Sequence, residues 1–220
     1  MAIYNRNSRT GTVFHDFSIP EKGSFLAGYS ALIEAHHVKV PAPDTLCIIG
    51  TKHKKYVDDR WNVFTPRHRP EDTLYGHLTF ALKYEGIDFA VLNALFQTIK
   101  ADEIEAIIRL EPTGIYSRKI WFLWEWLRDE QLDIEDATRG NFVPLINSKL
   151  QYEGKSSLSR RHRIRNNLPG TRNYCPLIRK TKKLEQYLGN NLSEAAVKNL
   201  GQTHPDLLSR AAAFLLLKDS

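Results

Sequence analysis

"TGIYSRKIWFLWEWL", residues 113–127, is the most hydrophobic helical segment of the chain and decides the predicted fold. A helix that is apolar on most of its sides belongs in the centre of a domain. Stacking of its tryptophans on nucleobases is the alternative, but core packing is favoured because buried aromatic side chains dominate core energetics. One helical face is predicted to carry Ile120, Trp121, Trp124 and Leu127, and another Phe122 and Trp126.

Helical patterns lie on both sides of this segment. Thr73 is the predicted N-cap of a helix whose apolar residues follow at helical spacing, and Gly86 is its predicted stop. Asp88 is predicted to cap the next helix. Pro112 is predicted to end another helix over 102–111. Further helices are expected over 24–38, 184–192 and 203–220, whereas 129–157 is expected to be rich in loops.

The β signal is confined to residues 46–65. An apolar run at 46–49 is followed by "YVDDRWNVF" (56–64), which suits a hairpin that turns at Asp58-Asp59. The predicted fold class is therefore mainly α, a multi-helix bundle-like domain with a small β-hairpin near residues 46–65.

The predicted domain organisation begins with a polar N-terminal arm over residues 1–23. A helical domain is predicted to follow over 24–220. A division of that domain into a small α+β part over 24–70 and a helical part over 71–220 is left open.

Composition and charge narrow the function classes. A hydrophobic fraction of 42% is that of a globular protein, and two cysteines without an apolar leader predict a cytoplasmic location. No apolar run approaches the length of a membrane span, so no membrane partner is expected. The net charge of +6 suggests an anionic partner.

The charge is also unevenly distributed along the chain. Residues 151–183 hold ten Lys and Arg against one acid, whereas residues 101–136 hold ten acids against four bases. The two blocks can pair within the fold, or the basic block can bind an external anion. The sequence leaves both interpretations open.

Two loops concentrate side chains that recognise phosphate or carboxylate, because guanidinium groups bind both bidentately. The chain has no phosphate-binding P-loop, dinucleotide fingerprint, His-Glu-x-x-His or Cys-x-x-Cys motif. No catalytic residue and no metal ligand is therefore assigned. The candidate residues for binding an anion, a nucleotide or an interface partner are Arg67, His68, Arg69, Arg160, Arg161, His162, Arg163, Arg165, Asn166 and Asn167.

Four long strings stand out in the chain: "TPRHRPEDTLYGHLTFALKYEGIDFAVLNALF" (65–96), "EPTGIYSRKIWFLWEWL" (111–127), "SRRHRIRNNLPGTRNYCPLIRKT" (159–181) and "THPDLLSRAAAFLLLKDS" (203–220). They resemble the N-terminal region of large bacterial Fic (filamentation-induced) family proteins, collinearly over most of residues 20–220. Complete members of that family are mostly helical and transfer AMP from ATP to a protein hydroxyl with Mg2+. Their signature, His-Pro-Phe-x-Asp/Glu-Gly-Asn-Gly-Arg, is absent here, since the only His-Pro, His204-Pro205, continues as Asp-Leu-Leu.

The resemblance implies a regulatory or adaptor domain that is inactive by itself and needs no cofactor, whereas complete members use ATP and Mg2+. Its implied partners are a Fic catalytic domain, in cis or in trans, and a protein target; a homo-oligomer is left open. The apolar helix at 203–220 has no stop signal. It is expected to lead into the catalytic domain, the chain being a fragment, a split gene or a truncated frame.

The alternative function is a nucleic-acid- or anion-binding module that uses the basic segment 159–183. Nucleic acid is the weaker version, because the chain carries no recognised DNA- or RNA-binding motif.

Overall fold

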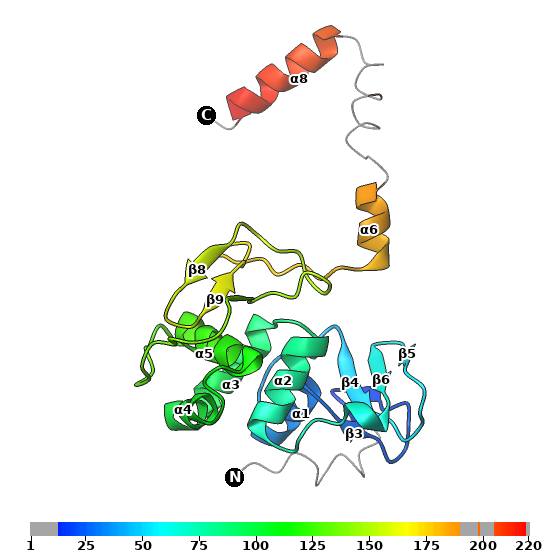
Figure 1. Ribbon diagram of the computed structural model, residues 1–220. Helices are drawn as coiled ribbons and strands as arrows, with labels where there is room; N and C mark the ends of the chain where they lie inside the picture. The colour runs from blue at the N-terminus through cyan, green and yellow to red at the C-terminus, as the bar shows by residue number, and fades with distance from the viewer. Residues whose placement is uncertain (1–12, 190–197, 199–204, 219–220) are drawn as a thin grey trace. The chain divides into compact units, whose positions relative to one another are not determined.

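The computed structural model describes residues 13–189, 198 and 205–218 (Figure 1). The chain divides into two units, residues 1–179 and 180–220. The second unit contains α6 (Lys182–Gly189) and α8 (Pro205–Lys218). Of the predicted N-terminal arm, residues 1–12 lie outside the described part. The remainder contains the antiparallel pair β1 (Val13–Phe14) and β2 (Phe17–Ser18), and Phe14 belongs to the core.

The described residues combine helices with three β-sheets, so the predicted mainly α class is wrong and the chain is an α/β protein. The sheets contain two, four and three strands. The first unit contains helices α1 (Tyr29–His36), α2 (Leu74–Tyr84), α3 (Phe89–Thr98), α4 (Ala101–Leu110) and α5 (Ile115–Arg128).

The four-stranded sheet has the order β3-β4-β6-β5, formed by β3 (Phe25–Leu26), β4 (Leu46–Ile49), β6 (Trp61–Phe64) and β5 (Tyr56–Asp58). The predicted hairpin is present, since β5 pairs antiparallel with β6. The strand β4, however, pairs parallel with β6, and β3 occupies the start of the segment expected to be helical. A parallel pair joins segments that lack a tight turn between them, so no local turn signal announces it.

The three-stranded sheet has the order β7-β9-β8 and lies where a loop was expected. It is formed by β7 (Val143–Pro144), β9 (Ile164–Asn166) and β8 (Ser157–Ser159). The arginine-rich segment is therefore the turn of the β8–β9 hairpin, with Arg163 at a φ of 53°. Strands of two or three residues are too short to produce an alternating pattern.

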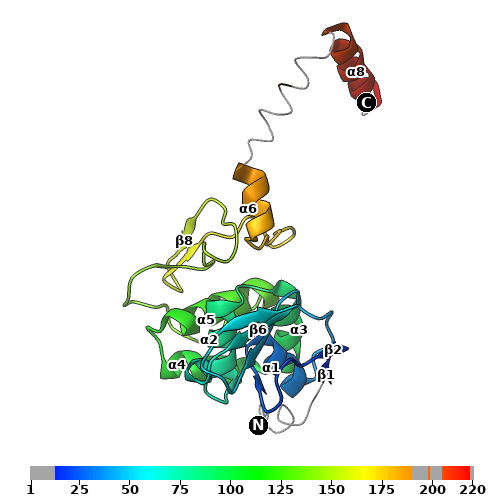
Figure 2. The same ribbon diagram turned by 90° about the vertical axis from the view of Figure 1, so that its right-hand side faces the viewer.

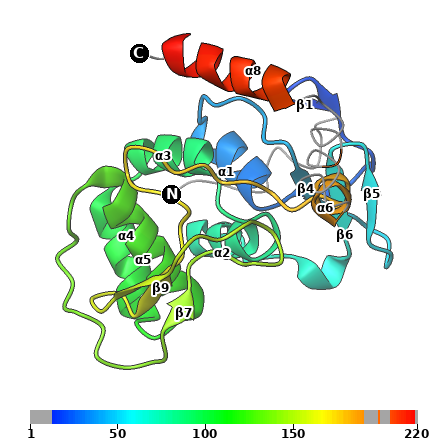
Figure 3. The same ribbon diagram turned by 90° about the horizontal axis from the view of Figure 1, so that it is seen from above.

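Within the first unit, the helices lie to one side of the four-stranded sheet (Figure 2), and α1 contacts β4 directly. Seen from above, α1 and α2 lie between this sheet and the α4–α5 pair (Figure 3). Trp121 and Trp124 of α5 are 1% and 2% exposed, so core packing is the role the structure gives them. The predicted caps are confirmed. Thr73 Oγ1 accepts a hydrogen bond from Gly76 N at 3.0 Å, and the Asp88 carboxylate accepts from Ala90 and Val91 N.

A buried carboxyl group joins the end of α2 to the start of α1. Glu85 Oε1 accepts a hydrogen bond from Tyr29 N at 3.0 Å, and Tyr29 Oη donates to Gly86 O at 2.8 Å. Gly28, at a φ of +59°, passes so close to Glu85 that a Cβ there would clash. Burial raises the pKa of Glu85 to about 8. The contact is therefore made by a neutral acid at pH 7.

Candidate functional site

Glu125 on α5 is the centre of the predicted arginine cluster. Its carboxylate accepts hydrogen bonds from Trp121 Nε1 at 2.7 Å, His162 Nε2 at 3.0 Å, Arg161 Nη2 at 2.9 Å and Leu132 N at 3.1 Å. Burial alone would raise the pKa of Glu125. The hydrogen bonds from His162, Arg161, Trp121 and Leu132 outweigh burial and lower that pKa to about 2.

Arg161 uses the rest of its guanidinium within the protein as well. Nη1 donates to Asp136 Oδ1 and to Ile134 O, each at 2.8 Å, and Nη2 donates to Leu132 O at 2.8 Å. Glu125 and Asp136 both belong to the acidic block over residues 101–136. Of the two interpretations left open by the sequence, the structure shows internal pairing for Arg161.

The other hairpin residues divide into two groups. Arg163 donates to the carbonyls of Ala137 and Thr138, and Asn167 is buried with its amide bonded to both backbone groups of Ile146. The side chain of Asn166 accepts a hydrogen bond from Leu168 N at 3.1 Å, a local turn contact. Arg160 and Arg165, by contrast, are exposed.

The first predicted cluster lies in a separate place. Arg67, His68 and Arg69 follow Thr65 around the 3-10 helix η1 (Pro66–His68) and line a cavity of about 490 Å³. His68 Nδ1 lies 2.8 Å from Thr65 Oγ1, and burial together with Arg67 lowers the pKa of His68. The Arg69 guanidinium lies 4.0 Å from the centre of the Phe25 ring. The structure therefore does not join the two predicted clusters into one site.

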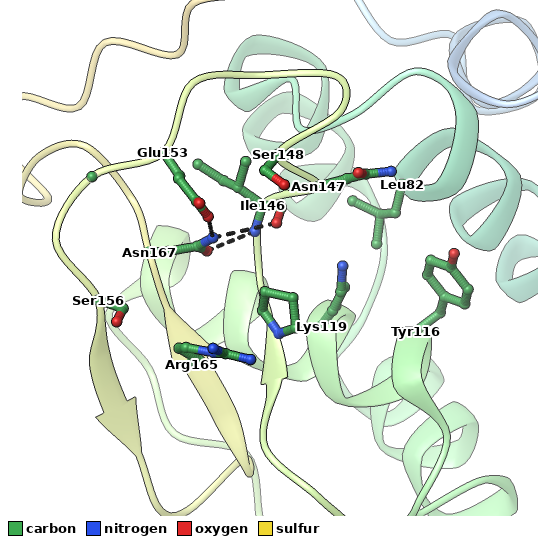
Figure 4. Close-up of a pocket in the computed structure, with 12 residues that line it drawn as sticks. Leu82, Tyr116, Lys119, Ile146, Asn147, Ser148, Glu153, Ser156, Arg165 and Asn167 are labelled. Carbon is green, nitrogen blue, oxygen red and sulfur yellow. Dashed lines mark hydrogen bonds between the residues drawn. The ribbon is translucent and has the colours of Figure 1, made fainter.

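A second cavity, of about 370 Å³, lies beside the three-stranded sheet and contains a residue that the sequence did not single out, Lys119 (Figure 4). Tyr116 and Lys119 reach it from α5, and Arg165 from β9. The segment after β7 contributes Ile146, Asn147 and Ser148, and the approach to β8 contributes Ser156. Figure 4 shows the Lys119 ammonium pointing toward the space between Tyr116 and the Asn147–Ser148 turn.

Lys119 is 6% exposed, and its Nζ lies 5.7 Å from the centre of the Tyr116 ring. Among residues 13–189, 198 and 205–218, the structure records neither a hydrogen bond from Nζ nor a carboxylate within ion-pair distance. Burial lowers the pKa of Lys119 to about 8. The sequence feature that could have identified Lys119 is its place in the string "RKIWFLW", because an ammonium group on so apolar a helix needs a polar environment at its end.

Comparisons of the chain with models of protein families, with curated proteins and with solved structures find no match. Within the described part of the chain, no group of three or more His, Cys, Asp or Glu residues could hold a metal ion. None of the helices formed by those residues has the length and apolarity that crossing a membrane requires.

Proposed function

We propose that the chain is a regulatory or adaptor domain of a Fic-type protein and does not transfer AMP by itself. The observation that carries this proposal is the exposure of large apolar side chains on the helices of the second unit. Tyr187 and Leu188 on α6 are 49% and 61% exposed, and Leu207 and Phe214 on α8 are 59% and 68% exposed. Exposed apolar groups gathered on helices mark surfaces that a partner covers.

The partner we assign to α8 is the Fic catalytic domain that the resemblance implies. Leu207 and Phe214 are seven positions apart, so both lie on one side of α8. Two apolar anchors at that spacing suit a helix that docks in a groove. Residues 205–218 also fall within the last of the four strings that carry the resemblance.

The other strings support a scaffolding role for the first unit. Residues 65–96 form η1, α2 and most of α3, and residues 111–127 form most of α5. Residues 159–181 contain the turn whose Arg161 is bound to Glu125. These unusual segments thus build the domain, which is the expected pattern if the domain positions a catalytic partner or its target.

The first test is an AMP-transfer assay. The 220-residue chain, incubated with labelled ATP, Mg2+ and a bacterial lysate, is expected to label neither itself nor another protein. Transfer of AMP by the purified chain would overturn the proposal that it is inactive alone.

The second test addresses the partner. The chain is mixed with the separately produced catalytic domain of a Fic protein whose own N-terminal region carries the same four strings. A 1:1 complex is expected by size-exclusion chromatography with light scattering. Leu207→Asp and Phe214→Asp are expected to abolish it, because each places a charge in an apolar contact. Ser209→Asp adds the same charge on the opposite side of α8 and is the matched control. Absence of a complex, or equal effects of the three variants, would count against the adaptor role.

Less supports the nucleic-acid alternative. Arg161 and Arg163 are bound to protein groups, and Arg172 pairs with Asp129, so these bases are not free for phosphates. Arg160 and Arg165 remain exposed. Binding to duplex DNA would weaken with salt, with a log–log slope of about −0.9 per phosphate contact. A titration at two salt concentrations tests this, and no binding at low salt would remove the alternative.

A further inference from the structure

We propose that the cavity around Lys119 is a binding site for a small phosphate-bearing ligand, with the Lys119 ammonium as its central cation. The proposal concerns the first unit alone and is independent of any Fic partner. Lys119 is almost fully buried, and among the residues that the structure describes no carboxylate lies within ion-pair distance of its ammonium. Burying an unpaired ammonium costs free energy that a bound anion would restore.

A neighbouring cation shows that burial alone does not require a ligand. Arg118 precedes Lys119 on α5 and is 2% exposed. Its guanidinium donates to the carbonyls of Gly114, Asn141 and Arg163 at 2.9 to 3.2 Å. The described part of the chain therefore supplies acceptors for one buried cation of α5 and none for the next. The contrast identifies the Lys119 ammonium as the group whose partner is a ligand.

The cavity wall offers further donors. The Arg165 guanidinium reaches the cavity from β9, and Ser148 and Ser156 bring hydroxyl groups. Asn147 also lines the cavity, and its Oδ1 accepts a hydrogen bond from Lys149 N at 3.1 Å; an asparagine amide carries an NH2 donor beside that oxygen. Two cations of different geometry together with neutral donors match the several acceptor oxygens of a phosphate group.

The acid in the wall is engaged elsewhere. Glu153 accepts a hydrogen bond from Asn167 Nδ2, and Figure 4 shows this contact on the far side of Ile146 from Lys119. The Glu153 carboxylate is thus held by Asn167, the residue that follows β9. It does not neutralise the ammonium.

Size and shape restrict the ligand further. The volume of about 370 Å³ lies at the lower end of the range for ligand pockets. Tyr116 forms one wall with its ring. A phosphate group with one small substituent fits this space. A phosphate within a polymer backbone can be bound on an open surface and does not require such a cavity.

The test uses inorganic phosphate on the full chain at pH 7, followed by isothermal titration calorimetry and thermal unfolding. One phosphate per chain is expected to bind and to raise the melting temperature. In Lys119→Met the affinity is expected to fall at least about tenfold, because a charge-assisted contact is lost. The same variant is expected to melt at a higher temperature than the wild type without phosphate, because it buries no charge. A purely structural lysine would give the opposite change in melting.

Two arginine variants of the β8–β9 hairpin complete the experiment. Arg165→Glu, at an exposed position, is expected to weaken phosphate binding at least about tenfold. Arg160→Glu makes the same charge change on an exposed residue outside the cavity and is expected to leave the affinity unchanged. If Lys119→Met does not fold, this matched pair decides the question.

Acetate serves as the carboxylate probe and is expected to bind at least about tenfold more weakly than phosphate, because it offers fewer acceptor oxygens. Equal binding of acetate and phosphate would overturn the assignment to phosphate. No binding of phosphate by the wild type, or equal loss in both arginine variants, would overturn the site itself.

Discussion

The same three residues, Arg-His-Arg, occur at 67–69 and at 161–163, and the structure uses them in opposite ways. In both triplets the histidine Nδ1 meets a hydroxyl three residues earlier, Thr65 Oγ1 at 2.8 Å and Ser159 Oγ at 2.7 Å. The local turn is thus alike in its hydrogen bonding. The second histidine is 6% exposed and the first is only half-buried, so the surroundings differ.

The difference is one buried acid. Glu125 faces Arg161 and His162 from α5, and it converts the second triplet into part of the scaffold. At the first triplet, His68 packs instead against the rings of Phe64 and Tyr84. The role of a basic cluster is therefore set by the side chains that a distant element of the fold brings into contact with it.

The largest effect should follow removal of that acid. Glu125→Gln leaves Arg161 and His162 without their shared carboxylate in a buried setting. We expect a loss of about 3 kcal/mol in the free energy of unfolding, because the buried ion pair is broken and Arg161 keeps only the exposed Asp136 as an acidic partner. Urea unfolding at pH 7 measures it.

The exposed acid Glu130 supplies the control, since Glu130→Gln is expected to change stability by less than about 0.5 kcal/mol. The acid limb of the pH profile adds a check. The pKa of Glu125 is lowered to about 2, so its contribution is present above pH 4.5 and is lost as pH falls from 4.5 toward 2. The same acid limb in the wild type and in Glu125→Gln would show that Glu125 does not set the second triplet apart from the first.

A second prediction extends the rule to an acid that lacks a basic partner. Within residues 13–189, no basic side chain is recorded within ion-pair distance of Glu85, and burial raises its pKa to about 8. The folded state therefore retains a proton that the unfolded state releases. The contribution of the Glu85 carboxyl group to the free energy of unfolding is fully present below pH 4.5 and is lost as pH rises from 4.5 to 8.

Glu85→Gln is expected to remove this dependence, because an amide stays neutral at every pH. The wild type should lose about 2.5 kcal/mol between pH 5 and pH 7 relative to the variant, since the slope is at most about 1.4 kcal/mol per unit of pH. Urea unfolding at the two pH values gives the difference. An equal change in both proteins would mean that Glu85 is ionised when folded.

The sequence predicts what depends on neighbouring residues and misses what depends on distant ones. The caps at Thr73 and Asp88, the hairpin at Asp58-Asp59 and the buried face of 113–127 follow from spacing within one segment. The parallel pairing of β4 with β6 and of β7 with β9 joins segments that no short pattern connects, and this pairing overturned the mainly α class.

The candidate site shows the same limit. Arg165 was among the predicted binding residues because it lies in a visibly basic string. Lys119 was not, because it lies in a mostly apolar helix and most of the residues that share its cavity come from residues 144–167. Only the fold brings the turn after β7 and the strand β9 to the side of α5.

A third prediction compares the two histidines directly. His162→Ala removes a buried donor from Glu125 and a ring that packs on Trp121, and we expect a loss of about 1.5 kcal/mol. His68→Ala removes a ring that is only half-buried and should lose about 0.5 kcal/mol. Chemical denaturation of both variants gives the ratio. Equal losses would show that Glu125 adds little to the second triplet.

The smallest effect is expected at the outer arginine of the first triplet. Arg67 is exposed, and no ion pair of its guanidinium is recorded within the described ranges. Arg67→Gln should therefore change the free energy of unfolding by less than about 0.5 kcal/mol. Its counterpart, Arg161→Gln, removes hydrogen bonds to two acids and two carbonyls and should lose about 2 kcal/mol or more. The pair is best measured by urea unfolding at low and at high salt, because an exposed charge is screened and a buried one is not. If Arg67→Gln lost more than 1 kcal/mol and high salt abolished that loss, an acid would interact with the first triplet too. The two triplets would then differ only in the strength of their pairing.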